Sequence, residues 1–207
     1  CLIVQNIIFF FIRMKHPKLN LKDELLPDIR EFKAPALAQK IINSNQIAEL
    51  VSLAFEKDHL LSSRAMWVLG HCSDLDYDCT KPYHIKLINN LKQSNLHNGV
   101  IRNTLRLFQK HPVPKKTESF ILDKCFEYIK NPSEAIAVRA FAITVVFNIA
   151  KPYPELLNEL LIVLNHLSET ENGPGIRSRV KNTIKAIHKL NKQLCEIIFL
   201  RSFLSIK

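Results

Sequence analysis

Glycine is scarce in this sequence, with 4 residues among 207. The 10 prolines, in contrast, fall between apolar periodic stretches and not inside them. Proline disrupts a helix interior but is tolerated between helices, so this punctuation is typical of a helical protein. Hydrophobic residues make up 47% and charged residues 23%, which is ordinary globular usage and argues against wholesale disorder. The sequence therefore predicts an all-α fold, and its length suits one domain.

The motifs of common enzyme classes are also missing. The chain contains no glycine-rich phosphate loop, no GxSxG nucleophile elbow and no HExxH zinc motif. The Gly-Ser-Ser-x-Met-Pro signature loop of the fumarase and adenylosuccinate lyase superfamily, another all-helical class, is absent too. We therefore expect a protein that is not an enzyme and that has no cofactor and no small-molecule substrate.

The five cysteines contain no CxxC pair, are odd in number and lie far apart. This usage favours a reducing compartment, and we expect a cytoplasmic protein. Four side chains could in principle bind zinc: His71, Cys72, Cys79 and His84. Their spacing matches no standard structural zinc site. The run 74–78 resembles the start of a calcium loop, but Cys79 replaces the required glycine and Ile85 the bidentate glutamate. No metal is expected.

The apolar ends of the chain are too short to cross a bilayer, which takes about 20 residues. Positive charges follow the apolar run 1–12, whereas a secretory signal places them before it. We take Met14 as the natural start, so that residues 1–20 form an N-terminal extension that is not native before Met14; an interfacial anchor is the alternative. Residues 191–207 are expected to form a C-terminal capping helix or a tail, with read-through sequence as the competing explanation.

An arginine recurs at the head of successive amphipathic segments. These arginines are Arg64, Arg102, Arg139 and Arg177, at spacings of 38, 37 and 38 residues. Apolar residues accompany each one at helical spacing, as Val138, Ala142 and Val145 do around Arg139. A further amphipathic segment precedes each of these helices, at 47–55, 85–91, 120–129 and 156–167. Each unit is thus a helical hairpin, which cannot bury its own apolar face, so the units are expected to stack.

This pattern resembles the HEAT-repeat family of armadillo-type α-solenoids, in which a helix pair of about 40 residues carries a Val-Arg opening on its second helix. The stretch from Asn131-Pro132 through Val138-Arg139 to Ile149 carries the resemblance most clearly. The resemblance covers roughly residues 45–190 and extends to short, uncharacterised bacterial HEAT-like proteins. It implies a right-handed α-α superhelix of about four hairpins and implies no reaction. We expect this superhelix to be a monomer that acts as a binding scaffold.

The expected domain organisation follows the repeat. N-terminal capping helices are predicted over residues 21–44, before four HEAT-like repeats over 45–190. The repeats are placed at about 45–78, 79–112, 113–152 and 153–190.

The resemblance also implies which side of the solenoid is basic, because the second helix of each pair lines the concave side. The second helices hold ten basic residues and one acidic residue, Glu134, whereas the first helices hold five basic and seven acidic residues. A surface of one charge sign concentrates an oppositely charged partner. The predicted partner-binding residues are Arg64, Arg102, Arg106, Arg139, Arg177, Lys181 and Lys185.

Two alternatives stay open at this point. The repeated arginines of such solenoids commonly bond to carbonyls or acids of the neighbouring repeat, so they can form an internal ladder instead. The row four residues further along each helix alternates apolar and basic residues: Val68, Arg106, Ile143 and Lys181. This row suits an acidic, amphipathic protein segment better than a phosphate backbone, although nucleic acid is the second hypothesis. A HEAT-like DNA glycosylase is a more remote hypothesis, because its chemistry would need a carboxylate and aromatic side chains in the groove. The only acid that we expect on the inner helices is Glu134, and we assign Trp67 to the core.

Overall fold

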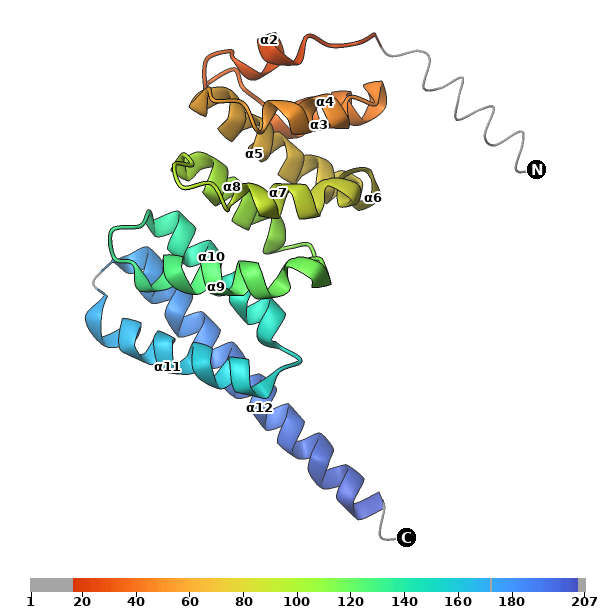
Figure 1. The fold of residues 1–207 in the computed structure, drawn as a ribbon. Coiled ribbons are helices and arrows are strands. Elements are labelled where there is room, and N and C mark those ends of the chain that lie inside the picture. The colour runs from red at the N-terminus through yellow and green to blue at the C-terminus, as the bar shows by residue number, and fades with distance from the viewer. Residues whose placement is uncertain (1–16, 172, 205–207) are drawn as a thin grey trace, which may run out of the picture. The chain divides into compact units, whose positions relative to one another are not determined.

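The computed structural model describes residues 17–171 and 173–204, and within these ranges the chain forms α-helices and two short 3-10 helices without a strand (Figure 1). The helices are α2 (Leu21–Leu25), α3 (Ala34–Ser44), α4 (Ile47–Leu53), α5 (His59–Leu75), α6 (Tyr77–Thr80), η1 (Lys81–Tyr83), α7 (His84–Asn90), α8 (Asn98–Phe108), η2 (Lys115–Thr117), α9 (Glu118–Lys130), α10 (Ile136–Ala150), α11 (Pro154–Thr170) and α12 (Pro174–Leu204). The all-α prediction is confirmed. The predictions on residues 1–13 and on Met14 fall outside the described residues.

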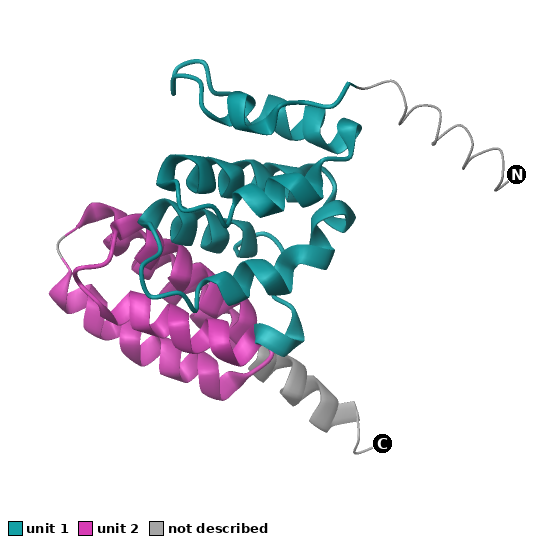
Figure 2. Ribbon diagram, turned by 45° about the horizontal axis from the view of Figure 1, so that its top comes forward, with its two compact units in different colours: residues 1–117 teal, residues 118–207 magenta. Residues whose placement is uncertain are grey.

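The chain divides into two compact units, residues 1–117 and 118–207 (Figure 2). In unit 1, α5 packs against both α3 and α8, and α4 packs against α5. In unit 2, α9 packs on α10 and α11 on α12, while α12 also packs against α10. The four arginine-bearing helices predicted from the repeat are α5, α8, α10 and α12, and each follows a shorter partner helix. The stacking of second helices inside each unit is the packing expected of a HEAT-like solenoid.

Local sequence signals explain where the helices begin and end. The Asp58 carboxylate accepts hydrogen bonds from the backbone N–H groups of Leu60 and Leu61, at 2.9 and 3.0 Å, and so caps α5. Helix α3 ends at Ser44, and its C-cap residue, Asn45, has a φ of 56° in the left-handed region that asparagine tolerates. Prolines occupy the first turns of α11 and α12, where their missing N–H has no helical partner to lose.

Helix α8 approaches α5 at Gly99, near its N-terminus. The N-cap residue His97 accepts the Gly99 backbone N–H on Nδ1 at 3.1 Å. A Cβ at residue 99 would stand only 2.4 Å from Oγ and 2.8 Å from Cβ of Ser63 on α5. The absence of a side chain at residue 99 therefore allows the two helices to pack this closely.

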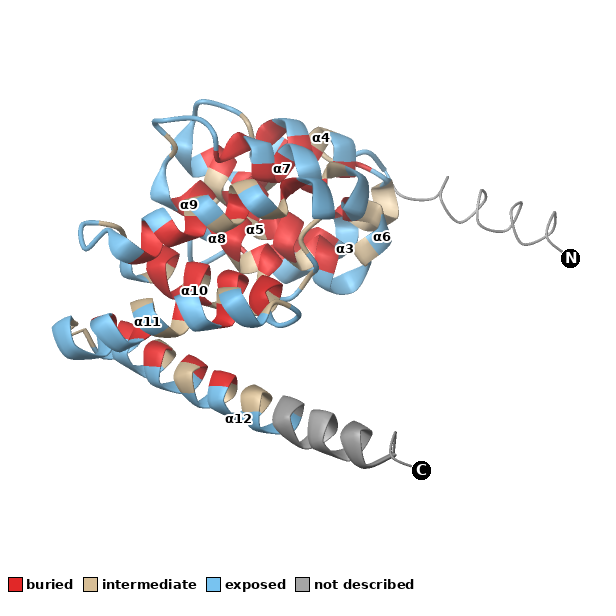
Figure 3. Ribbon diagram, turned by 60° about the horizontal axis from the view of Figure 1, so that its bottom comes forward, coloured by how far each residue is buried: buried red, intermediate tan, exposed pale blue. Residues whose placement is uncertain are grey.

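The cores of both units are built from the apolar stripes predicted from the sequence (Figure 3). On α5, Ala65, Val68 and Leu69 are fully buried, and on α10 Val138, Ala142 and Val145 are fully buried. Helix α12 continues without a break from Pro174 to Leu204, so residues 191–204 extend it and do not begin a separate helix. One side of its described part is buried and the other exposed (Figure 3).

Candidate partner-binding surface

Arg64, the first arginine of the repeat, is buried. Its side chain is 7% exposed, and Nη1 donates hydrogen bonds to the carbonyl oxygens of Leu25 and Pro27, at 2.8 and 2.6 Å. Its guanidinium group also lies 4.7 Å from the centre of the Phe32 ring. Arg64 therefore holds the segment between α2 and α3 onto α5, and it is not available to a partner.

Arg139, the third arginine, is buried in unit 2 and 4% exposed. Its Nε and Nη2 donate to the carbonyl oxygen of Ile129 at the end of α9, at 3.3 and 3.2 Å. Nη2 also forms an ion pair with Glu171, which follows α11. Arg139 thus ties the ends of two first helices to α10. The internal bonding weighed against binding in the sequence is present at Arg64 and Arg139.

Arg102 and Arg177, in contrast, are exposed. No other described residue forms an ion pair or a hydrogen bond with either side chain. Helix register explains the difference between Arg64 and Arg102. Arg64 is the sixth residue after its N-cap, Asp58, and the sixth residue after the N-cap His97 is Asn103, whose Nδ2 donates to the Ser63 carbonyl oxygen at 2.8 Å. Asn103 therefore takes the inward place on α8 and Arg102 faces solvent.

The sequence also predicted a row of alternating apolar and basic residues on the binding surface, and this prediction is wrong for its apolar members. Val68 and Ile143, the apolar members of the row that includes Arg106 and Lys181, are fully buried at 0% exposure. They belong to the helix cores and contribute no apolar surface to a partner. Apolar contact surface has to come from other residues.

In unit 1, Arg106 of α8 reaches across to α5. A Cβ at Gly70 would lie 4.0 Å from Arg106 Nη1, so the guanidinium group lies against the α5 backbone. The neighbouring residue, His71, is half-buried, and its ring centre lies 6.2 Å from that of Trp67. Burial, and then the charge of Arg106, lower the pKa of His71. Trp67 is partly exposed, although the sequence placed it in the core.

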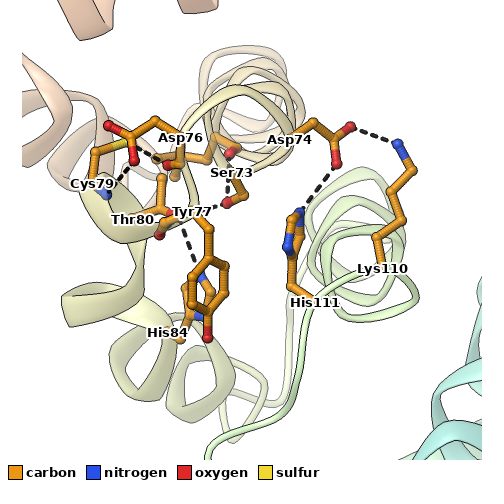
Figure 4. Close-up of polar contacts among 10 residues, drawn as sticks. Ser73, Asp74, Asp76, Tyr77, Cys79, Thr80, His84, Lys110 and His111 are labelled. Carbon is orange, nitrogen blue, oxygen red and sulfur yellow. Dashed lines mark hydrogen bonds and ion pairs between the residues drawn. The ribbon is translucent and has the colours of Figure 1, made fainter.

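Asp74 links the ends of α5 and α8 (Figure 4). Its Oδ2 accepts from Lys110 Nζ at 2.6 Å and its Oδ1 pairs with His111 Nε2 at 3.1 Å. Partial burial opposes ionisation of Asp74, but the hydrogen bonds from Lys110 and His111 outweigh it and lower the pKa of the carboxyl group. Helix α5 extends to Leu75 and therefore contains Asp74, which the sequence did not place on a second helix. Glu134, the acid expected on one, lies in the turn before α10.

Beside this pair, a buried hydrogen-bond chain joins α5 to α7 (Figure 4). Ser73 Oγ lies 2.7 Å from Thr80 Oγ1, which lies 3.2 Å from His84 Nε2. Burial first, and then the charges of His111 and Lys81, lower the pKa of His84 to about 4. Within the described ranges, His84 Nδ1 has no hydrogen-bond partner. This chain is a structural connection, because His84 is enclosed at 0% exposure.

The four soft side chains noted in the sequence do not converge on one point. Cys72 is buried with Sγ directed to the Ala38 carbonyl oxygen at 3.9 Å, and Cys79 Sγ donates to the Asp76 carbonyl oxygen at 3.0 Å. Burial raises the pKa of Cys79 to about 11, so this thiol stays protonated at neutral pH. Among the residues described, no three His, Cys, Asp or Glu side chains are grouped as metal ligands.

In unit 2, the predicted residues Arg177, Lys181 and Lys185 are all exposed and lie on one face of α12. They line a groove of about 640 Å³ together with Ser168 of α11. The other residues lining this groove are Ser178, Val180 and Ile184. Val180 is buried, but Ile184 is only half-buried and presents apolar surface beside the three cations. We call this site the α12 groove.

A second groove in unit 2 was not found in the sequence. It has a volume of about 600 Å³ and lies between the end of α9 and α11, with Arg139 and Glu171 among its lining residues. Ile162 on its wall is 71% exposed. Ile162 belongs to the uninterrupted apolar run 160–164, in which nothing in the sequence distinguishes an outward residue from an inward one.

A family model for the HEAT repeat domain matches residues 21–187. The chain belongs to this family. HEAT repeat domains are typically non-catalytic and generally mediate protein interactions, so the chain is a protein-interaction scaffold in the general sense. No curated protein and no solved structure matches it. Within the described helices, none combines the length and the apolar character needed to cross a membrane.

Proposed function

We propose that this HEAT repeat protein is a non-catalytic scaffold that binds an acidic protein segment through the basic side chains of its second helices. Five of the seven predicted residues are accessible for this: Arg102 and Arg106 in unit 1 and Arg177, Lys181 and Lys185 in unit 2. None of the five has an acidic partner in the described part of the chain. Exposed cations without internal partners attract an anionic ligand and can pair with it at no cost to the fold.

The α12 groove is the observation that carries the proposal. Arg177, Lys181 and Lys185 recur every fourth residue, and no acidic residue occurs between residues 174 and 193. Beside these cations, the half-buried Ile184 forms the apolar floor of the groove. A segment with carboxylates beside aliphatic side chains would satisfy both parts of this groove, whereas a purely polar polyanion would leave the apolar floor exposed.

A charge-reversal experiment tests this proposal. Lys181→Glu combined with Lys185→Glu should abolish recovery of the partner from a cell lysate, because two attractive contacts become repulsive. The matched control is Lys22→Glu combined with Lys116→Glu, which makes the same charge change at exposed lysines outside the second helices. Mass spectrometry identifies the recovered proteins, and circular dichroism checks that both variants fold. Equal recovery by the two double variants would remove the α12 groove from the binding surface.

Nucleic acid binding is the second candidate, because the same five cations could contact phosphates. Two observations make it weaker. Arg64 and Arg139 are buried, so the basic row is interrupted, and the ionised Asp74 stands at the end of α5. The related glycosylase chemistry needs a free carboxylate, but both Asp74 oxygens are occupied by Lys110 and His111. An electrophoretic shift assay at moderate salt should show no DNA or RNA bound at micromolar protein.

A further inference from the structure

We propose that Trp67, His71 and Arg106 form an anchor site in unit 1 for an acidic protein segment, with an aliphatic side chain packing on the Trp67 ring and a carboxylate pairing with Arg106. This inference rests on the proposed function and names a second site for it, outside the α12 groove. The three residues come from the adjacent helices α5 and α8.

Trp67 supplies the apolar part of this anchor site. Its inner side packs on Phe32, with the ring centres 5.4 Å apart, and His71, one helical turn later, lies beside it. The ring is thereby fixed, while part of it stays exposed to solvent. A rigid, partly exposed tryptophan offers a large contact area and loses little conformational freedom when a partner binds.

Arg106 supplies the charge. It is half-buried beside Gly70 of α5, and this partial burial reduces competition from water. The nearest acidic residue of α5 is Asp74, whose two oxygens already pair with Lys110 and His111, so it leaves the charge of Arg106 uncompensated. The lowered pKa of His71 keeps this ring neutral at pH 7, so His71 adds contact area and no second charge.

The charge pattern favours a protein segment over a nucleic acid strand. Arg106 supplies the positive charge beside His71, and the Asp74 carboxylate stands at the edge of the anchor site. A nucleic acid strand carries a phosphate at every nucleotide, so one phosphate would lie close to the negatively charged Asp74 carboxylate and be repelled by it. An acidic peptide can place a carboxylate on Arg106 and an uncharged residue next to Asp74.

The sequence contains one tryptophan, so the fluorescence of the full chain reports on Trp67 alone. The probe is a tryptophan-free peptide of glutamate and leucine arranged as an amphipathic helix, and the comparison peptide replaces leucine by serine. We expect the glutamate–leucine peptide to shift the Trp67 emission to shorter wavelength and the glutamate–serine peptide to leave it unchanged. Affinity is measured separately, by the anisotropy of a fluorescein-labelled copy.

Two variants and a control separate the anchor site from the α12 groove. Arg106→Gln should lower the affinity about fivefold or more, which is typical of an interface arginine. Trp67→Phe, which keeps the packing on Phe32, should lower it by a smaller factor, and Arg30→Gln, at an exposed arginine outside the site, should not change it.

The outcomes are distinct. If the peptide binds without any change of emission, and Arg106→Gln binds as tightly as Arg30→Gln, the anchor site is refuted while the proposed function stands. Absence of any peptide binding would refute the proposed function itself. A shift of Trp67 emission by oligothymidylate but not by the peptide would assign the site to nucleic acid and overturn the inference.

Discussion

At the scale of single residues, the repeated arginine shows that one sequence motif can have two structural roles. Arg64 and Arg139 bond to backbone carbonyls and are buried, while Arg102 and Arg177 are exposed. Removing a buried guanidinium group leaves its partners buried and unpaired. This lowers the free energy of unfolding far more than removing an exposed guanidinium group does. The four positions should therefore differ sharply when mutated.

Arg139→Met is expected to lower the free energy of unfolding by about 3 kcal/mol, because it leaves the Glu171 carboxylate and the Ile129 carbonyl oxygen without their donor. Arg102→Met, the matched change at an exposed repeat position, should stay within about 0.5 kcal/mol of the wild type. Urea unfolding followed by circular dichroism measures both. Similar losses in the two variants would contradict the separate roles assigned to them.

Gly99→Ala is expected to destabilise the protein by about 1–3 kcal/mol, because the added Cβ collides with Ser63. Alanine normally stabilises a helix relative to glycine by about 1 kcal/mol, so the expected sign is reversed here. At Gly175 the nearest atom to an added Cβ is Ile136 Cγ2 at 3.4 Å, and Gly175→Ala should be neutral or mildly stabilising. Thermal unfolding compares the two, and Ser63→Gly should rescue Gly99→Ala if the collision is the cause.

At the scale of helices, the connection from α5 to α7 depends on the protonation of His84. The unfolded chain takes up a proton on this residue near pH 6.5, whereas the folded chain resists it until about pH 4. Between these values the unfolded state binds more protons, so stability is lost as the pH falls from 6.5 to 4, by up to about 3 kcal/mol. Urea unfolding across this pH range should show the loss.

The control for this dependence is a change at an exposed histidine. His84→Gln removes the titrating group and should flatten the pH dependence, leaving the smaller contribution of His71, whose pKa is lowered in the same direction. His166→Gln, at an exposed position on α11, should keep the wild-type dependence. An unchanged slope in His84→Gln would show that another group causes the acid sensitivity.

The positions of the helices could be predicted from the sequence, but which of their residues are exposed could not. Proline placement and the 37- to 38-residue period predicted α5, α8, α10 and α12, because backbone geometry and apolar spacing act locally. Helix register explains the exposure of Arg102, because α8 starts so that Asn103 replaces it on the inward side. Arg139 and Arg177 are each the fourth residue of their helices and still differ in burial, so that difference depends on packing. The exposure of Trp67 depends on packing against Phe32, 35 residues away in the chain, and no local pattern encodes it.

At the scale of the whole molecule, the distribution of charge determines what kind of ligand the scaffold can select. The net charge is +10, but two of the repeated arginines are buried and Lys110 is paired with Asp74. The predicted cations that stay accessible occur in small groups next to apolar surface, which Trp67 provides in unit 1 and Ile184 in unit 2. Binding at such sites should combine a modest electrostatic part with an apolar part that salt does not screen.

This distribution predicts a shallow salt dependence. The affinity for the glutamate–leucine peptide should fall by no more than about tenfold between roughly 50 and 200 mM salt, whereas a ligand held by six or more phosphates would lose about 1,000-fold or more over that range. Anisotropy titrations at several salt concentrations measure the slope, with a single-stranded oligonucleotide as the comparison ligand. A steep slope for the peptide would mean that charge alone holds it, and the apolar floor of the α12 groove and the ring of Trp67 would then have no part in binding.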